Sequence, residues 1–265
     1  MREQGTLSRI YCSAPLGPPL ISLLLFADCM LVSMASLRHG MFGIFTTWNG
    51  FVYPWQWYTT VFEHGWADVP MAIHLGGNML VLLTCGAFIE RLLGTKRFVL
   101  VALIAFLTFT LPFAPFQRFG IGISWVVWPF GPLAALALYY EYRASGKAVF
   151  QDPVFWLLVF TLFMMYVFVG FIFGLRFADS YELGFLIGFL FGLLSHMVPT
   201  MIGAVFAYKW RLLIRARLDA IRTSGGRAWV RGGRFDRFLQ ICAVAITLSV
   251  VLIIILSLTG TITPP

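Results

Sequence analysis

The chain has 265 residues, of which 60% are hydrophobic and only 11% are charged, and its mean hydropathy is +0.86. This composition excludes an ordinary soluble domain and indicates a multi-pass membrane protein. The formal net charge of +8 is explained below by membrane topology, so we expect no nucleic-acid partner.

Apolar segments of about 20 residues recur along the chain, and each is long enough to cross about 30 Å of hydrocarbon as a helix. We predict seven spans, at residues 19–37, 71–92, 97–116, 121–140, 153–175, 182–208 and 236–259. The predicted fold class is therefore an all-α polytopic membrane protein. We divide it into an N-terminus (1–18), a six-span core (19–208), a basic connector (209–235) and a seventh span with a short tail (236–265).

Basic residues gather on one side of this predicted topology. Sixteen of the 19 lysines and arginines lie in the N-terminus and in alternate connections, nine of them between Lys209 and Arg237. The asymmetry predicts that the N-terminus lies on the cytoplasmic (or matrix-like) side and the C-terminus on the opposite side. The basic connector can attract anionic lipid, but we favour a plain topology determinant.

Other features of the chain point to few ligands. The four cysteines, Cys12, Cys29, Cys85 and Cys242, have no metal-ligand spacing, so we expect no metal and no cofactor. The connection before the second span is rich in aromatic residues, which is typical of the headgroup layer. Asp28, in the first span, is the ionisable residue that these patterns explain least, because such a group needs a partner or a cavity.

Polar side chains mark the beginnings of the second and fourth spans. His74 and Asn78 are four residues apart and so lie on one face of a helix. Ser124 stands in the tetrapeptide Gly122-Ile123-Ser124-Trp125. With the predicted topology, all these groups lie toward the outer side and can share one depth. Polar groups in hydrocarbon are costly, so a functional site is the default interpretation, although His74 and Asn78 can also simply order the outer loop.

Over about residues 19–208, the sequence resembles the rhomboid family of intramembrane serine proteases and their inactive relatives. The family pattern has Trp-Arg, Thr, Phe and His in the first outer loop, His-x-x-x-Asn in the second span, and Glu then Gly after it. Gly-x-Ser-Gly and His-x-x-Gly-x-x-x-Gly follow in the fourth and sixth spans. The matching residues are Trp55, Gln56, Thr59, Phe62, His64, His74, Asn78, Glu90, Gly94, Gly122, Ser124, Trp125, Tyr181, Gly184 and Gly188.

The resemblance implies a six-span bundle in which Ser124 occupies the position of the nucleophile. A histidine of the sixth span acts as the base in the family, and His74 and Asn78 would help to hold the oxyanion. Serine needs such a base because its hydroxyl is a weak nucleophile until the proton is removed.

Three departures from the family pattern argue against that chemistry here. Tyr181 occupies the base position, and a phenol that titrates near pH 10 is a poor base at neutral pH. A shift of the register by one turn puts Phe185 there instead. His196 lies some 15 residues further along the span, about 22 Å at 1.5 Å per residue, so we expect it to be out of reach of Ser124.

The other two departures are Trp125, where glycine permits a close approach of the sixth span, and Gln56, where the loop motif has arginine. We therefore interpret the chain as a pseudoprotease. It would act as a scaffold, adaptor or subunit that binds other membrane proteins or transmembrane helices, within the bilayer or in a larger complex. The alternative is an active protease with Ser124 as nucleophile and an unusual base. A transporter is a third class, which would need paired ionisable groups at the midplane.

Overall fold

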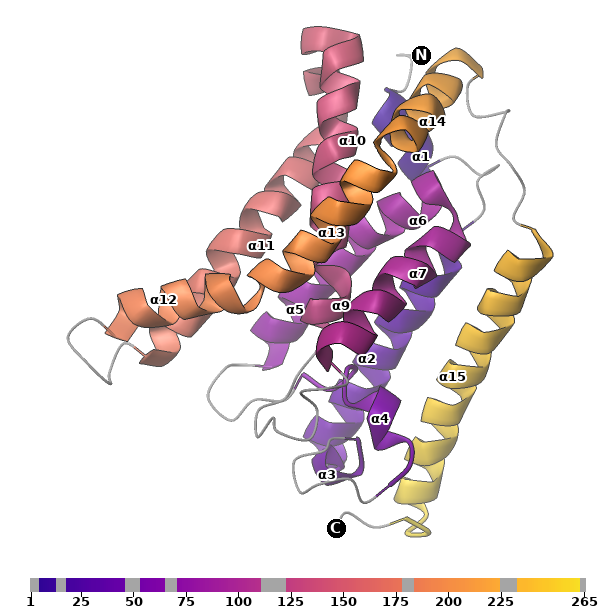
Figure 1. Ribbon diagram of the computed structural model, residues 1–265. Coiled ribbons are helices and arrows are strands. Elements are labelled where there is room, and N and C mark those ends of the chain that lie inside the picture. Colours follow the sequence, from indigo (N-terminus) through magenta and orange to yellow (C-terminus); the bar gives the residue numbers. More distant parts are fainter. Residues whose placement is uncertain are drawn as a thin grey trace.

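The computed structural model describes residues 5–12, 18–45, 53–64, 71–110, 123–177, 184–224 and 233–262. Every regular element in these ranges is helical, and the helices form an elongated bundle (Figure 1). The first half of the chain contains α1 (Thr6–Cys12), α2 (Leu20–His39), α3 (Phe42–Phe45), α4 (Gln56–Thr59), α5 (Met71–Val81), the π-helical turn η2 (Leu82–Gly86), α6 (Ala87–Leu93), α7 (Thr95–Ala105) and the π-helical turn η3 (Phe106–Thr110).

The second half contains α9 (Ser124–Val127), α10 (Phe130–Ser145), the 3-10 helix η5 (Gly146–Gln151), α11 (Pro153–Phe177), α12 (Gly184–Ser195), α13 (Met197–Lys209), α14 (Arg211–Ser224) and α15 (Arg234–Leu258). Within the described residues, each predicted span coincides with a helix or with consecutive helices. The all-α polytopic prediction is thereby confirmed.

Four helical stretches in the described ranges are long and apolar enough to cross a membrane: Leu20–His39, Ile73–Leu93, Gly184–Lys209 and Arg234–Leu258. A fifth is added if the pair Ser124–Gln151 and Pro153–Val167, bent by 106°, counts as one span. Seven crossings therefore remain a prediction, although α7 with η3, α10 and α11 also occupy predicted spans.

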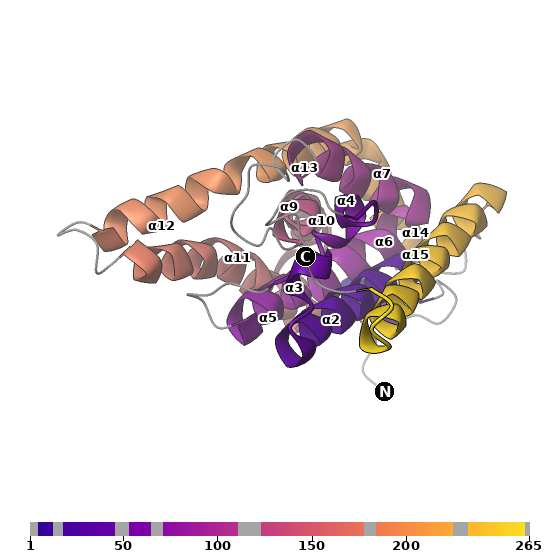
Figure 2. The ribbon, with the colours of Figure 1, turned by 90° about the horizontal axis from the view of Figure 1, so that it is seen from below.

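The core of the bundle is built around α10, which packs against α6, α11, α13 and α14. Phe130, at its start, stacks on Phe98 of α7 with ring centroids 4.4 Å apart, and both rings are fully buried. The view along the bundle shows α9 and α10 surrounded by the other helices (Figure 2). The fourth predicted span therefore lies at the centre of the bundle, and α6, α11, α13 and α14 pack around it.

Glu90 joins the second span to the first. Its carboxylate accepts hydrogen bonds from the backbone N–H groups of Ile21 (3.0 Å) and Ser22 (2.9 Å) and from the Ser22 hydroxyl (2.8 Å). These N–H groups belong to the first turn of α2 and have no partner within that helix. Glu90 of α6 therefore caps the N-terminus of α2. Gly94, four residues later, has φ +87°, a conformation that favours glycine, and it lets α6 turn directly into α7.

The pair α11 and α12 packs tightly together and projects from one side of the bundle (Figures 1 and 2). Phe189 and Phe185 of α12 lie against Gly170 and Gly174 of α11, where a β carbon would come within 2.7 Å of a ring. The helix α12 therefore packs on the fifth predicted span, and α13 makes the contact with α10.

The last helix, α15, lies on the outside of the bundle against α2 and α7 (Figure 1). Its Ser249 hydroxyl is 2.9 Å from the hydroxyl of Tyr58 in the first outer loop, and Thr247 lies beside the buried Asp28 of α2. Asp28 Oδ1 has no hydrogen-bond partner among the described residues. The α1 end and the end of α15 lie at opposite ends of the bundle (Figure 1), and the side of the membrane on which each terminus lies stays a prediction.

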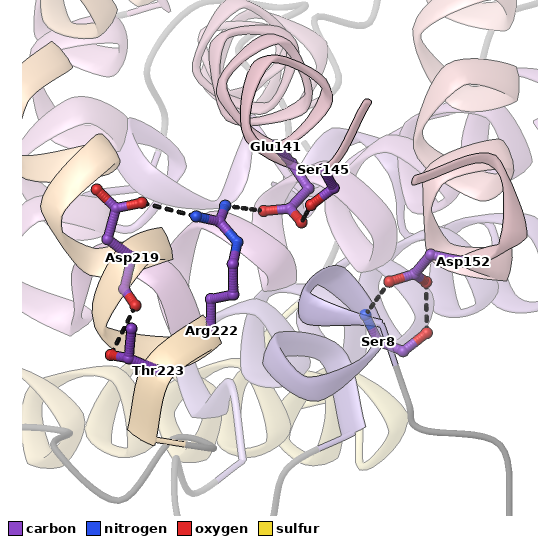
Figure 3. Close-up of polar contacts among 7 residues, drawn as sticks. All are labelled: Ser8, Glu141, Ser145, Asp152, Asp219, Arg222 and Thr223. Atoms are coloured by element: carbon purple, nitrogen blue, oxygen red, sulfur yellow. Dashed lines mark hydrogen bonds and ion pairs between the residues drawn. The ribbon is translucent and has the colours of Figure 1, made fainter. Parts of the chain in front are cut away.

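The basic connector is partly an ordered helix, α14, that docks on the ends of other helices. Its apolar face, Ile214, Leu218 and Ile221, is buried. Arg217 donates a hydrogen bond of 2.7 Å to the carbonyl of Leu92 near the end of α6. A cation at a helix C-terminus is favoured by the helix dipole. The helix thus closes one end of the bundle together with α1, where Asp152 accepts hydrogen bonds from the backbone and hydroxyl of Ser8 (Figure 3).

Candidate active site

Ser124 and His196 form a hydrogen-bonded pair in the interior of the bundle. Nε2 of His196 lies 3.2 Å from Oγ of Ser124, and the two residues are 4% and 5% exposed. Ser124 is the first residue of α9, and His196 stands between α12 and α13. A serine hydroxyl at this distance from an imidazole nitrogen has the geometry of a nucleophile with its general base.

His196 lies at a break in the sixth predicted span, between α12 and α13. Pro199 has no N–H and cannot donate to the carbonyl of Ser195, so the helical ladder is interrupted there. The Nδ1 atom of His196 lies 3.1 Å from the carbonyl oxygen of Gly192, which fixes the proton on Nδ1. Nε2 is then the nitrogen that accepts a hydrogen bond from the Ser124 hydroxyl. The ring of Trp128 lies against the imidazole, with centroids 4.2 Å apart.

Gly203 brings α13 against the start of α10. A β carbon at this position would be 2.2 Å from the carbonyl oxygen of Pro129. Only glycine permits that approach, and Pro129 lies five residues after Ser124 in the chain. Gly203 follows His196 by seven residues, about two helical turns. The contact therefore sets the distance between the helices that carry Ser124 and His196.

His64 supports the turn that precedes Ser124. Its Nε2 accepts a hydrogen bond of 3.4 Å from the backbone N–H of Ile123, and its Nδ1 lies 2.9 Å from the carbonyl oxygen of Phe62. Both contacts require a neutral ring with the proton on Nδ1. Burial, with a smaller contribution from His74, lowers the pKa of His64 to about 3, so the ring is neutral at physiological pH. His64 is a positioning residue for the serine turn.

His74 and Asn78 of α5 border the same cluster. The rings of His74 and His64 meet edge to face with centroids 5.1 Å apart, and His74 interacts electrostatically with His196. Asn78 is 5% exposed, and its amide nitrogen has no hydrogen-bond partner in the ranges described. Asn78 stands one turn after His74 on the same face of α5, and a buried, unsatisfied N–H donor in that position is suited to an oxyanion, because a developing charge would satisfy it.

The remaining residues of the predicted motifs support the first outer loop or lie elsewhere. Gln56 is fully buried, and its side-chain oxygen accepts a hydrogen bond of 3.0 Å from the backbone of Tyr53, so the amide orders this loop without a charge. Trp55 donates to the carbonyl of Ile44, and Thr59 to that of Phe45, both at 2.9 Å. Gly122 and Tyr181 lie outside the described residues.

Two expectations from the sequence are wrong. His196 was expected to be out of reach of Ser124, and it contacts it. The error came from converting a residue count along one span into a distance from a residue on another, although α9 begins deep in the bundle and the helices cross. Tryptophan at position 125, where glycine permits a close approach of the sixth span, was expected to count against protease chemistry, yet the Ser124–His196 contact forms beside a half-buried Trp125.

The base was missed because the sixth-span pattern was aligned on glycine spacing. His196 and Gly203 match the histidine and the last glycine of His-x-x-Gly-x-x-x-Gly, with Pro199 at the first glycine. A search that began from the histidine would have found this register. Trp128 had no signal of its own in the sequence, because a tryptophan in an apolar span is usually a packing residue.

Comparison with known families gives one match. The family model of the rhomboid domain matches residues 53–211, which is more than half of the chain. The chain belongs to the rhomboid family. A comparison with curated proteins found no match, and a comparison with solved structures found none either. The matched range begins at Tyr53 and ends at the start of α14, so this rhomboid chain carries α1, α2, α3, nearly all of α14, and α15 outside it.

Proposed function

We propose that this rhomboid protein is an active intramembrane serine protease that cleaves the transmembrane segments of other membrane proteins. The observation that carries the proposal is the 3.2 Å contact between Ser124 Oγ and His196 Nε2. The pseudoprotease interpretation depended mainly on the lack of a base, and an imidazole with the required tautomer supplies one.

The proposed reaction is acyl transfer in two steps. His196 Nε2 takes the proton as Ser124 Oγ attacks the peptide carbonyl, and the protonated imidazole then gives that proton to the leaving amine. Water, deprotonated by the same nitrogen, next attacks the ester carbonyl and releases the carboxylic acid, and Ser124 regains its proton. The bond between Nδ1–H and the Gly192 carbonyl would stabilise the ring when it becomes charged.

Oxyanion stabilisation is assigned to α5. Asn78 Nδ2 carries N–H groups that are unsatisfied in the resting state, and His74 stands one turn earlier on the same face. Such donors are worth several kcal/mol in a site from which bulk water is excluded. We propose that the substrate binds against the apolar side chains around Ser124 and His196. The transmembrane segment must reach a serine that is itself buried.

The test is fluorophosphonate labelling of the purified protein, together with cleavage of a reporter that contains a transmembrane segment in proteoliposomes. Ser124→Ala should abolish both signals. His196→Gln should lower both rates by at least about 100-fold, because general-base catalysis contributes that much. Tyr181→Phe is the matched control: the register centred on His196 predicts wild-type rates for this variant.

The outcomes separate the alternatives. If Tyr181→Phe loses activity and His196→Gln keeps it, His196 is not the base. The alignment that puts Tyr181 at the position of the base would then be restored. Absence of labelling in the folded wild-type protein, while an active serine hydrolase labels in the same detergent, would return the chain to the pseudoprotease class. Its co-purifying membrane proteins would then become the object of study.

A further inference from the structure

A second polar site lies at the basic end of the bundle, far along α10 from Ser124. A cavity of about 270 Å³ opens between α10 and α14, and it is lined mainly by charged and aromatic side chains. These residues are Tyr139, Tyr140, Arg143, Arg215, Asp219 and Arg222. None of them takes part in the arrangement around Ser124.

The three arginines of this cavity have different surroundings. Arg222 donates 2.7 Å to Oε2 of Glu141 and 2.8 Å to Oδ1 of Asp219 (Figure 3). Glu141 is 2% exposed and also accepts a hydrogen bond from Ser145, so this ion pair is fixed within the fold. Both nearby carboxylates are thus engaged by Arg222, which holds α14 against α10.

Arg143 and Arg215 have no such compensation. Both are exposed, one on α10 and one on α14, and neither guanidinium group forms an ion pair or a hydrogen bond with any described residue. Two guanidinium groups thus converge on one cavity from different helices, and the three arginines exceed the carboxylates of Glu141 and Asp219 by one positive charge. Guanidinium groups bind phosphate oxygens through paired N–H donors, which makes a phosphate the ligand chemistry that fits.

The surroundings of the cavity identify a lipid as the source of that phosphate. Tyr139 is 53% exposed, and its neighbour Tyr142 is 45% exposed, as expected of tyrosines at the headgroup layer. Leu212 lies one turn before Arg215 on the same face of α14 and is 70% exposed. An apolar surface next to uncompensated arginines matches a molecule with a charged head and acyl chains. Basic pockets between helices at this side of a membrane commonly bind such headgroups.

We propose that Arg143 and Arg215 bind the phosphate of one anionic phospholipid in the cavity between α10 and α14. The bound headgroup links the end of α10 to α14. Because α14 follows α13 directly, and α13 starts next to His196, the lipid secures the helix that positions the proposed base. The site does not depend on whether Ser124 is catalytic.

The experiment is native mass spectrometry of the full chain in detergent, titrated with phosphatidic acid or with phosphatidylcholine of the same acyl chains. The test variant is Arg143→Gln/Arg215→Gln. The matched control is Arg234→Gln/Arg237→Gln, which removes two exposed arginines from the same end of the bundle but not from the cavity. Both variants change surface residues, so both are expected to fold.

One phosphatidic acid should bind the wild-type protein in preference to phosphatidylcholine, with the dissociation constant raised about tenfold or more in the test variant. The control variant should bind as the wild type does. Equal binding of the two lipids, or equal losses in both variants, would overturn the site. Displacement of phosphatidic acid by inorganic phosphate at a similar concentration would overturn the lipid as its source. A preference for phosphatidic acid that survives the test variant would place the lipid elsewhere.

Discussion

Replacement of Gly203 by alanine tests the link between helix packing and the proposed chemistry. The new β carbon would lie 2.2 Å from the carbonyl oxygen of Pro129 and 2.8 Å from its carbonyl carbon. Carbon and oxygen atoms of neighbouring helices approach to about 3.3 Å, so α13 must withdraw from α10 by about 1 Å. The neighbour here is backbone, which cannot change rotamer to make room.

Two effects follow from that displacement. Overpacking of this kind costs about 1–3 kcal/mol of stability. The contact of 3.2 Å between Ser124 and His196 would open beyond hydrogen-bond distance, because His196 is at the start of the displaced helix. A misplacement of about 1 Å at reacting groups can lower a rate by about 100-fold. We therefore expect Gly203→Ala to lose far more labelling than its loss of stability explains.

The assay measures the rate of fluorophosphonate labelling at a temperature well below the unfolding midpoint of the variant, and the midpoint itself. Gly76→Ala is the matched control, since a β carbon there meets no heavy atom within 4 Å. That variant should gain about 0.5–1 kcal/mol, as alanine does over glycine within a helix. Labelling of Gly203→Ala at the wild-type rate would refute the argument that this contact sets the distance between the serine and the histidine.

Two further predictions concern the supports of the site. The pKa of His64 is lowered to about 3, from an ordinary value of 6.5. Below pH 6.5 the unfolded chain therefore binds a proton at His64, while the folded protein keeps this ring neutral. The stability that His64 gives relative to His64→Gln should therefore shrink by about 2 kcal/mol between pH 6.5 and pH 5, as measured by thermal unfolding in detergent. His39→Gln is the control, and a difference that does not change with pH would contradict the neutral ring. Glu90→Ala leaves the first N–H groups of α2 without their acceptor and should cost about 3 kcal/mol or more. Glu141→Gln, which keeps a hydrogen-bond acceptor for Arg222, should cost less in the same denaturation assay.

Much of the fold could be predicted from the sequence because its signals are local. An apolar segment of sufficient length must satisfy its backbone groups as a helix, and each predicted span is helical where the structure describes it. Gly94, a motif residue identified from the sequence, has a positive φ and permits the tight turn after the second span. The motifs around His74 and Ser124 were also local, and they led to the family that the comparison shows.

The partners of these residues were less accessible. Glu90 was identified from the sequence only as a motif residue, and the structure shows that it caps the first turn of α2. The basic connector was interpreted as a topology determinant. Its arginines contribute to the charge asymmetry along the chain. Arg217 and Arg222 also attach α14 to the ends of α6 and α10. A sequence shows that such residues are charged but not which carbonyl or carboxylate they will meet.

The sequence by itself determined that this is a helical membrane protein, which segments are helices, and which serine stands at the start of the fourth span. The tertiary structure decided which histidine faces that serine, because the sixth-span motif fits the sequence in more than one register. Helices cross at angles and break, so a position along one of them does not give a distance to another. His196 stands at the break between α12 and α13, and it reaches Ser124 where Gly203 lets α13 touch the backbone of Pro129.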